Sequence, residues 1–211
     1  MSAPLPSLRT PLPGDGAPAG FPGVAAAAGV PAAPGPTAAA PGPAAAVPGP
    51  TAAELLDFVR RTADDTALVA SLPLDPDGRT WLRLEGPGGS EAWLIGWPPG
   101  TGTGWHDHAE SVGAFTVASG TLREHSLAAS IPTEGWRTLE LTEGIDRTRL
   151  LATGQGRAFG RHHVHEVLNE SGRQHAVSVH AYYPPLPRIR RYSRTGEVLR
   201  LEQTEGPEDW Q

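Results

Sequence analysis

The sequence contains no cysteine, no lysine and no long hydrophobic run. Without cysteine, disulfides play no part in the fold. No segment approaches the roughly 20 apolar residues of a membrane span, and prolines interrupt the early alanine-rich stretch where a signal peptide would need an unbroken apolar core. The 17 basic residues are all arginines, they face 23 acidic ones, and the net charge is −6. We therefore expect a cytoplasmic protein that binds neither membrane nor nucleic acid.

The first fifty residues also lack bulky apolar side chains, as the stretch "GVPAAPGPTAAAPGPAAAVPGP" shows. Such a composition cannot offset the conformational entropy that ordering would cost. The prediction is a disordered Ala/Pro/Gly-rich tail over residues 1–50, one folded domain over residues 51–200 and a flexible C-terminal tail over residues 201–211. No obligatory protein partner is indicated.

The remaining sequence predicts a helix followed by many short strands. Thr51 and Glu54 fit a capping box in front of the apolar residues Leu55, Leu56 and Val59. After this helix, short apolar or alternating runs are separated by turn residues: "RTWLRLEG", "EAWLIGW", "GAFTVASG", "TLREHSL", "GWRTLELTEG", "RTRLLATG", "HEVLNES" and "HAVSVHAYY". This spacing is typical of an all-β sandwich or barrel.

His106 and His108 lie two residues apart in the glycine-rich "GTGTGWHDHAES". On a strand both imidazoles point to one face, where they form half of a metal site. The alternative is a pair of solvated histidines at a sheet edge.

A second histidine cluster lies in "RHHVHEVLNES". His163 and His165 share one face of a strand and His162 points to the other. Either of the first two could be a ligand, and the spacing of His165 to Asn169 and to Ser178 favours His165.

Ser178, His180 and Tyr182 follow at alternate positions of the next strand. An inward face that carries a hydroxyl, an imidazole and a phenol is costly unless it lines a polar pocket. The alternative is a buried histidine that is satisfied by neighbouring hydroxyl groups.

These patterns resemble the two motifs of the cupin superfamily, the first running from Gly100 to Gly120 and the second from His165 to Asn169. The stretch "HEVLNESGRQHAVSVHAYYPP" resembles the cysteine dioxygenase family of thiol dioxygenases, and the likeness covers about residues 75–190. This resemblance implies a cupin-type β-barrel, a jelly roll, with one or more short N-terminal helices.

The sequence departs from these motifs at two places. Gly113 stands where general cupins carry a glutamate ligand and mammalian family members a cysteine cross-linked to tyrosine, whereas bacterial members resemble this chain in having glycine. Gly160 and His162 replace the proline and glycine of the second motif.

The resemblance also implies a chemistry. His106, His108 and His165 would hold Fe(II), and both atoms of O2 would be added to the sulfur of L-cysteine to give cysteine sulfinate. Three neutral imidazoles leave the charge of the ion available for a thiolate. Tyr182 would contact the substrate or its oxygen, His180 would orient Tyr182, and Ser178 would fix the tautomer of His180. The family has a cis peptide bond at the position of Tyr183 and Pro184.

The substrate carboxylate would be held by an arginine, for which we take Arg83, with Arg79 and Arg188 as competitors. The alternative functions are dioxygenation of 3-mercaptopropionate or another small thiol, and metal binding by a non-catalytic cupin. Glu110 is either a second-sphere acceptor or part of a polar turn, and His125, His162 and His175 are expected to be exposed.

Overall fold

The computed structural model describes residues 48–129 and 131–210. The predicted helix is present as α1 (Ala52–Ala63), with the capping box of Thr51 and Glu54 in place. A shorter helix, α2 (Thr66–Ser71), follows with Asp65 as its N-cap. Two 3₁₀ turns, η1 (Pro87–Gly89) and η2 (Pro207–Trp210), complete the helical elements of the described part of the chain.

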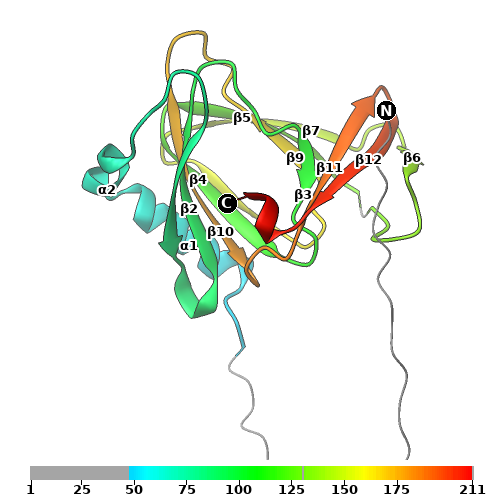
Figure 1. Ribbon diagram of the computed structural model, residues 1–211, viewed down its shortest axis with the longest axis horizontal. Coiled ribbons are helices and arrows are strands. Elements are labelled where there is room, and N and C mark those ends of the chain that lie inside the picture. The colour runs from blue at the N-terminus through cyan, green and yellow to red at the C-terminus, as the bar shows by residue number, and fades with distance from the viewer. Residues whose placement is uncertain (1–47, 130, 211) are drawn as a thin grey trace, which may run out of the picture. The chain divides into compact units, whose positions relative to one another are not determined.

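The strands form two antiparallel sheets, which confirms the predicted all-β, cupin-type architecture with short N-terminal helices (Figure 1). The five-stranded sheet has the order β1 (Thr80–Glu85), β2 (Glu91–Trp97), β10 (Ala176–Tyr183), β4 (Val112–Ser119) and β8 (Gly156–Phe159). The seven-stranded sheet has the order β6 (Thr138–Glu140), β12 (Val198–Glu205), β11 (Ile189–Thr195), β3 (Trp105–Asp107), β9 (His165–Leu168), β5 (Thr121–Leu127) and β7 (Asp146–Ala152).

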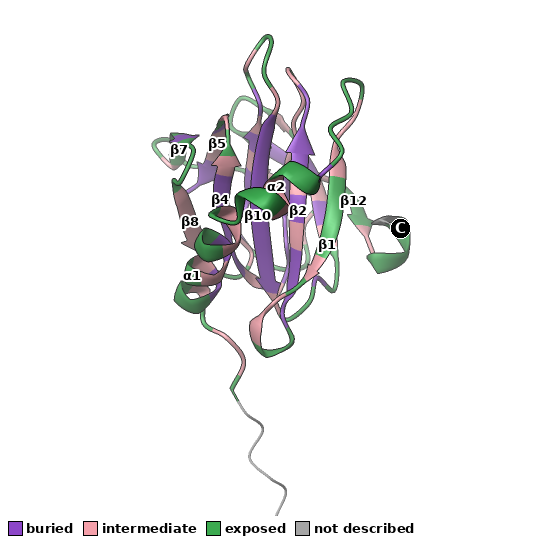
Figure 2. Cartoon of the chain, turned by 90° about the vertical axis from the view of Figure 1, so that its left-hand side faces the viewer, coloured by how far each residue is buried: buried purple, intermediate pink, exposed green. Residues whose placement is uncertain are grey.

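Alternating residues on β10 serve two different cores. Val177, Val179 and Ala181 pack in the cluster that contains Leu55 and Val59 of α1. Figure 2 shows α1 and α2 on this outer face of the five-stranded sheet. The opposite face, which carries Ser178, His180 and Tyr182, looks into the barrel, where a second cluster is built around buried aromatic side chains such as Trp97, Phe115 and Phe159. The two-residue period of a strand explains this division.

Two predicted boundaries need correction at the chain ends. The flexible tail expected over residues 201–211 is wrong, since residues 201–205 continue β12, which pairs with β11 and β6, and Pro207–Trp210 form η2. The tail expected over residues 1–50 lies almost wholly outside the described residues, but Gly49 is described and lies against Tyr183, and Pro50 against Gly88.

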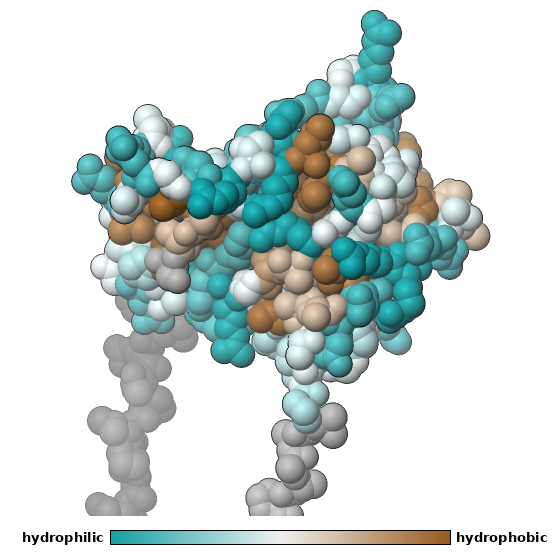
Figure 3. Space-filling model, turned by 180° about the vertical axis from the view of Figure 1, so that it is seen from behind, coloured by the Kyte–Doolittle hydropathy of each residue, from teal (hydrophilic) through white to brown (hydrophobic). Residues whose placement is uncertain are grey.

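Hydrophobic residues form small separate groups among hydrophilic ones on the face seen in Figure 3. No helix in residues 48–129 or 131–210 is long and apolar enough to cross a membrane.

Candidate metal centre and cavity

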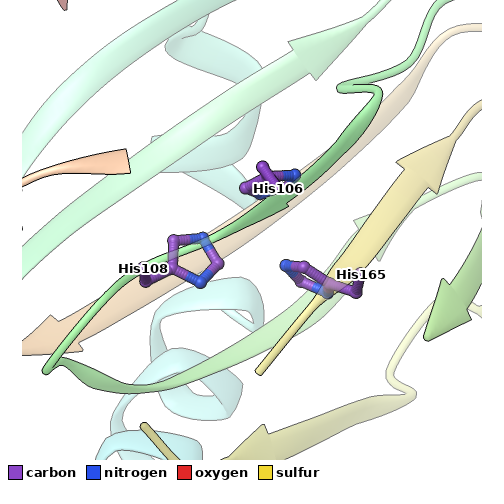
Figure 4. Close-up of side chains that lie close together, drawn as sticks. All are labelled: His106, His108 and His165. Carbon is purple, nitrogen blue, oxygen red and sulfur yellow. The ribbon is translucent and has the colours of Figure 1, made fainter. Parts of the chain in front are cut away.

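Three histidines from two adjacent strands converge inside the barrel. His106 lies on β3 and pairs in register with His165 of β9, and His108 follows the end of β3. One ligand nitrogen of each ring lies within 4.8 Å of the others, and all three residues are buried. Figure 4 shows the three rings turned toward one another. The pairing of β3 with β9 therefore brings together residues that are about sixty positions apart in the sequence.

In two of the three histidines, the ring nitrogen Nδ1 has a hydrogen-bond partner. Nδ1 of His106 lies 2.9 Å from the carbonyl oxygen of Gly104, and Nδ1 of His165 lies 2.9 Å from Oε1 of Glu124. If each Nδ1 carries the proton, each Nε2 keeps a free lone pair, as a metal ligand requires. Nδ1 of His108 is buried without a hydrogen-bond partner in the described part of the chain. Three imidazoles with one ring nitrogen each within 4.8 Å of the others are a donor set that fits a divalent transition metal.

Glu124, which the sequence analysis missed, is the acceptor behind this centre. Its fully buried carboxylate lies 2.7 Å from Nη1 of Arg157 and 3.5 Å from Nε2 of His163, in addition to His165. Burial alone would raise the pKa of Glu124, but the hydrogen bonds from His163 and His165 and the charge of Arg157 outweigh it and lower the pKa far below its ordinary value. Glu124 is therefore ionised and fixes the orientation of His165.

His106 and His108 are kept neutral by their surroundings. Burial is the largest cause that lowers the pKa of His106 well below its usual value, and the neighbouring His165 adds to it. The pKa of His108 is lowered well below normal by burial and by His106. Both rings are thus unprotonated at neutral pH, so no proton has to leave before they bind a metal.

Gly113 leaves no room for a fourth protein ligand. A Cβ atom built at this position would lie 2.5 Å from the ring of Phe159 and 3.0 Å from the ring of Tyr182. Phe159 in turn stacks on His108, with 5.3 Å between ring centroids. A glutamate at position 113, as in general cupins, would have to displace this aromatic ring, so the centre offers three imidazoles.

A buried ion pair anchors the segment that carries His106 and His108. Asp107 points away from the centre and accepts hydrogen bonds from Nε and Nη2 of Arg190, at 3.0 and 2.5 Å, and from the hydroxyl of Tyr192 at 2.9 Å. Its Oδ1 also accepts from the backbone N–H of Ala109. This arrangement fixes the backbone between the two histidines.

The predicted alternation on β10 is present as a chain of hydrogen bonds. The hydroxyl of Ser178 lies 2.8 Å from Nε2 of His180, and Nδ1 of His180 lies 3.2 Å from the hydroxyl of Tyr182. Trp97, which the sequence analysis did not single out, donates from its indole N–H to Ser178 across 2.8 Å. The ring of Tyr182 lies against His108, with 4.6 Å between centroids.

One hydrogen bond of this chain has a fixed direction. An indole N–H can only donate, so the hydroxyl of Ser178 accepts from Trp97 and has its own proton available for Nε2 of His180. Burial is the main cause that lowers the pKa of His180 to about 3, so the ring is neutral, and its proton sits on Nδ1 when Nε2 accepts from Ser178. Tyr182 then accepts from His180, and its hydroxyl proton is free to point into the barrel. Burial raises the pKa of Tyr182, which keeps that proton in place.

The histidines and Tyr182 line one cavity of about 510 Å³. Its walls combine aromatic and aliphatic side chains with a few polar groups. The residues that line it include Arg79, Trp97, His106, His108, His165, His180, Tyr182, Arg191, Gln203, Glu205 and Asp209.

Arg83 is not among the residues that line this cavity. It shares the inward face of β1 with Trp81, but its side chain is 69% exposed, lies over the ring of Trp93 and pairs with Glu91 at 3.2 Å. Arg188 pairs with Glu110 at 2.5 Å, and both are exposed. Of the three arginines weighed from the sequence, Arg79 alone lines the cavity, and the role of Arg83 at the substrate stays a prediction.

Arg79 faces the cavity without a carboxylate partner. Its guanidinium lies over the ring of Trp97, 5.3 Å from the centroid. No hydrogen bond or ion pair joins its side chain to any residue that the structure describes. Burial, and after it the charge of Arg191, lowers the pKa of Arg79 from its ordinary value, and the guanidinium stays charged. A half-buried cation without a carboxylate partner is suited to bind an anion.

The other predicted residues lie away from the centre. His163 is half-buried against Glu124 and does not line the cavity. His125 and His175 contact Thr148 and the backbone of Asp75, and His162 lies beside Arg190; all three were expected to be exposed but are half-buried. The peptide bond between Tyr183 and Pro184 is cis, as the family resemblance implied.

Several solved structures are similar to this chain at low identity. The Cnp3 cupin domain of Schizosaccharomyces pombe is 11% identical with a TM-score of 0.40, covering 54% of this chain and 65% of that one. An oxalate oxidase is 22% identical with a TM-score of 0.42, covering 55% of each chain. A protein of Thermus thermophilus is 18% identical with a TM-score of 0.39, covering 54% of this chain and 90% of that one. This chain thus spans less than two thirds of the first two structures.

Sequence comparison gives the family. No curated protein matches the chain. The family described as cysteine dioxygenase type I matches residues 40–195, which include the three histidines and the Ser178, His180 and Tyr182 alternation. On this match, the chain belongs to the cysteine dioxygenase type I family.

Proposed function

We propose that the protein is a non-haem Fe(II) thiol dioxygenase that adds both atoms of O2 to the sulfur of a small thiol carboxylate, with L-cysteine as the first candidate. The product of that reaction is a sulfinate. The proposal rests on one observation, namely that three converging imidazoles, the hydroxyl of Tyr182 and the unpaired guanidinium of Arg79 share one cavity.

Different side chains would bind the ion and the substrate. His106, His108 and His165 would hold the ion, and a ferrous ion there would lower the pKa of the substrate thiol and share electrons with dioxygen. Arg79 would pair with the substrate carboxylate through its planar fork of N–H donors. Because Trp97 supports the guanidinium from one side, the arginine is held ready before substrate arrives.

Tyr182 is the proton-bearing group that lies against the three-histidine centre. With its oxygen accepting from His180, the tyrosine can donate its hydroxyl proton to the substrate carboxylate or to oxygen at the sulfur. His180, Ser178 and Trp97 are positioning residues that hold Tyr182 in this orientation. Ionised Glu124 is likewise a positioning residue, which holds the orientation of His165.

Oxygen uptake by the iron-loaded protein tests the proposal. We expect uptake and sulfinate formation with cysteine or 3-mercaptopropionate, which carry a carboxylate for Arg79, and far slower turnover with cysteamine, which carries none. Metal analysis of the same sample checks that the ion is present. No uptake with any of the three thiols would overturn the dioxygenase proposal in favour of a non-catalytic, metal-binding cupin.

A matched pair of variants tests the role of Arg79. Arg79→Ala removes the only carboxylate-binding group that we assign, so the KM for cysteine is expected to rise by about 10-fold or more, the effect of a lost charge-assisted hydrogen bond. Arg83→Ala serves as the control, because the Arg83 side chain is largely exposed and does not line the cavity, and it is expected to leave KM within about twofold. A larger effect of Arg83→Ala would return the role to that residue.

A further inference from the structure

The outer wall of the cavity comes from a part of the chain beyond the family match, which ends at residue 195. Gln203 and Glu205 of β12 and Asp209 of η2 line the same cavity as the three histidines. β12 is held in place by pairing with β11, whose residue Arg191 also lines the cavity. Side chains of this hairpin can therefore select what enters the site.

Two arginines reach the cavity, but only one of them is paired. The Nε and Nη2 atoms of Arg191 each lie 2.9 Å from an oxygen of Glu205, in a two-point ion pair, and Nη1 lies 3.1 Å from the carbonyl oxygen of Thr103. The side chain of Glu205 is 15% exposed, so the pair is largely shielded from water. Among the residues that the structure describes, no carboxylate pairs with Arg79.

The consequence is a cavity with one free cation instead of two. A carboxylate that approached Arg191 would have to displace Glu205 from two hydrogen bonds, and it would also meet the negative charge of Asp209 on the same wall. A carboxylate at Arg79 displaces no protein group. The charge pattern therefore accommodates one carboxylate and opposes a second.

We propose that Glu205 is a specificity-determining residue, which neutralises Arg191 and restricts the site to thiols that carry a single carboxylate. This inference rests on the proposed function for its thiol, but its charge argument concerns carboxylates alone. Removing the carboxylate of Glu205 frees Arg191 and converts the cavity into one that favours dicarboxylates.

Binding of propionate and succinate to the metal-free protein tests the charge argument without any reaction. The fluorescence of the tryptophans that line the cavity, Trp81, Trp93 and Trp97, provides the signal. In the wild type we expect the two dissociation constants to agree within about threefold. In Glu205→Gln the preference for succinate over propionate should grow by about 10-fold or more, since a freed guanidinium gains a charge-assisted bond.

The control is Glu202→Gln, on the same strand, because Glu202 bonds to Ser193 instead of lining the cavity. It should leave the preference unchanged, and the double variant Arg191→Gln/Glu205→Gln should abolish the gain. A wild type that already prefers succinate about 10-fold, or a Glu205→Gln variant that behaves like Glu202→Gln, would overturn the inference. If Glu205→Gln does not fold, the wild-type ratio and the variant Glu205→Ala still decide it.

Turnover separates this inference from the proposed function. With the iron-loaded protein, the ratio of kcat/KM for mercaptosuccinate to that for 3-mercaptopropionate should rise about 10-fold in Glu205→Gln. If no thiol supports oxygen uptake while succinate binding responds to Glu205→Gln, the proposed function fails and the charge selectivity stands. If thiols are oxidised but Glu205→Gln changes neither the binding ratio nor the kcat/KM ratio, the proposed function stands and the selectivity role of Glu205 is wrong.

Discussion

The indole N–H of Trp97 donates to the hydroxyl of Ser178 across 2.8 Å and begins the chain of hydrogen bonds that runs through His180 to Tyr182. Since Trp97 ends β2 and Ser178 lies on the adjacent β10, the two residues are 81 positions apart in the chain. The donor that orients the tyrosine is thus supplied by the neighbouring strand.

Trp97→Phe should slow turnover while leaving metal binding intact. The phenyl ring keeps a face for Arg79, but Ser178 loses its donor, so its hydroxyl no longer has a fixed direction. One lost hydrogen bond of about 1 kcal/mol corresponds to a decrease in kcat of roughly fivefold. Steady-state oxygen uptake at saturating thiol measures this, with KM and metal content as controls. An unchanged kcat would show that Ser178 orients His180 without Trp97.

Glu124→Gln should weaken metal binding. Glutamine keeps the size of the side chain but removes the charge that orients His165, and loss of such a partner typically costs roughly 10- to 100-fold in metal affinity. Competition with a chelator of known affinity gives the dissociation constant. Glu166→Gln is the matched control, because Glu166 directly follows His165 but is not part of the hydrogen-bonded network around Glu124. Equal effects of the two substitutions would contradict the role of Glu124.

Single alanine substitutions should separate the ligands from His163. His106→Ala, His108→Ala and His165→Ala each remove one of three imidazoles and should abolish stoichiometric metal retention. His163→Ala should retain the metal, because its Nε2 faces Glu124 at 3.5 Å and the ring does not line the cavity. Elemental analysis after dialysis provides the measurement. A variant of His163 that loses the metal, with His106→Ala retaining it, would move the site to the alternative group of Glu124, His163 and His165.

The metal-free protein should lose stability as the pH falls below about 6.5, the ordinary pKa of histidine. The pKa of His180 is lowered to about 3 by burial, so between these two values the unfolded chain binds a proton at this residue that the folded chain does not. The free energy of unfolding therefore decreases with falling pH, by about 1.4 kcal/mol per pH unit for this one group. Urea denaturation at several pH values between about 6.5 and 5.0 in the presence of a chelator measures the slope. His180→Asn should reduce that slope by the same amount, and an unaltered slope would contradict the assignment.

Gly113→Ala should destabilise the fold, since its Cβ would lie 2.5 Å from the ring of Phe159. Overpacking of a filled core typically costs about 1–3 kcal/mol. Gly172→Ala, where no atom lies within 4 Å of the added Cβ, is the control and should be nearly neutral. The free energy of unfolding from urea titration compares the two. Equal stability of both variants would mean that Phe159 moves aside easily and that a fourth ligand could be accommodated.

The sequence by itself determined much of the fold, because its signals are local. The capping box at Thr51 and Glu54, the alternation on β10 and the histidine pair near β3 each depend on residues within a few positions of one another. The same alternation placed Leu122, Glu124 and Ser126 on one buried face of β5, so a charged residue among inward positions was a usable signal for Glu124.

Only the tertiary structure decided which groups complete the site. Arg79 lines the cavity and Arg83 does not, although Arg79, just before β1, keeps the same alternation as Arg83, because the side chain of Arg83 extends toward solvent and pairs with Glu91. Trp97 and Ser178 meet through the pairing of β2 with β10, and Glu205 reaches Arg191 because β12 joins the sheet where a flexible tail was expected. The partner strand of β2 is about eighty positions away, and how far β12 extends along β11 is settled by packing, so local patterns of residues predict neither contact.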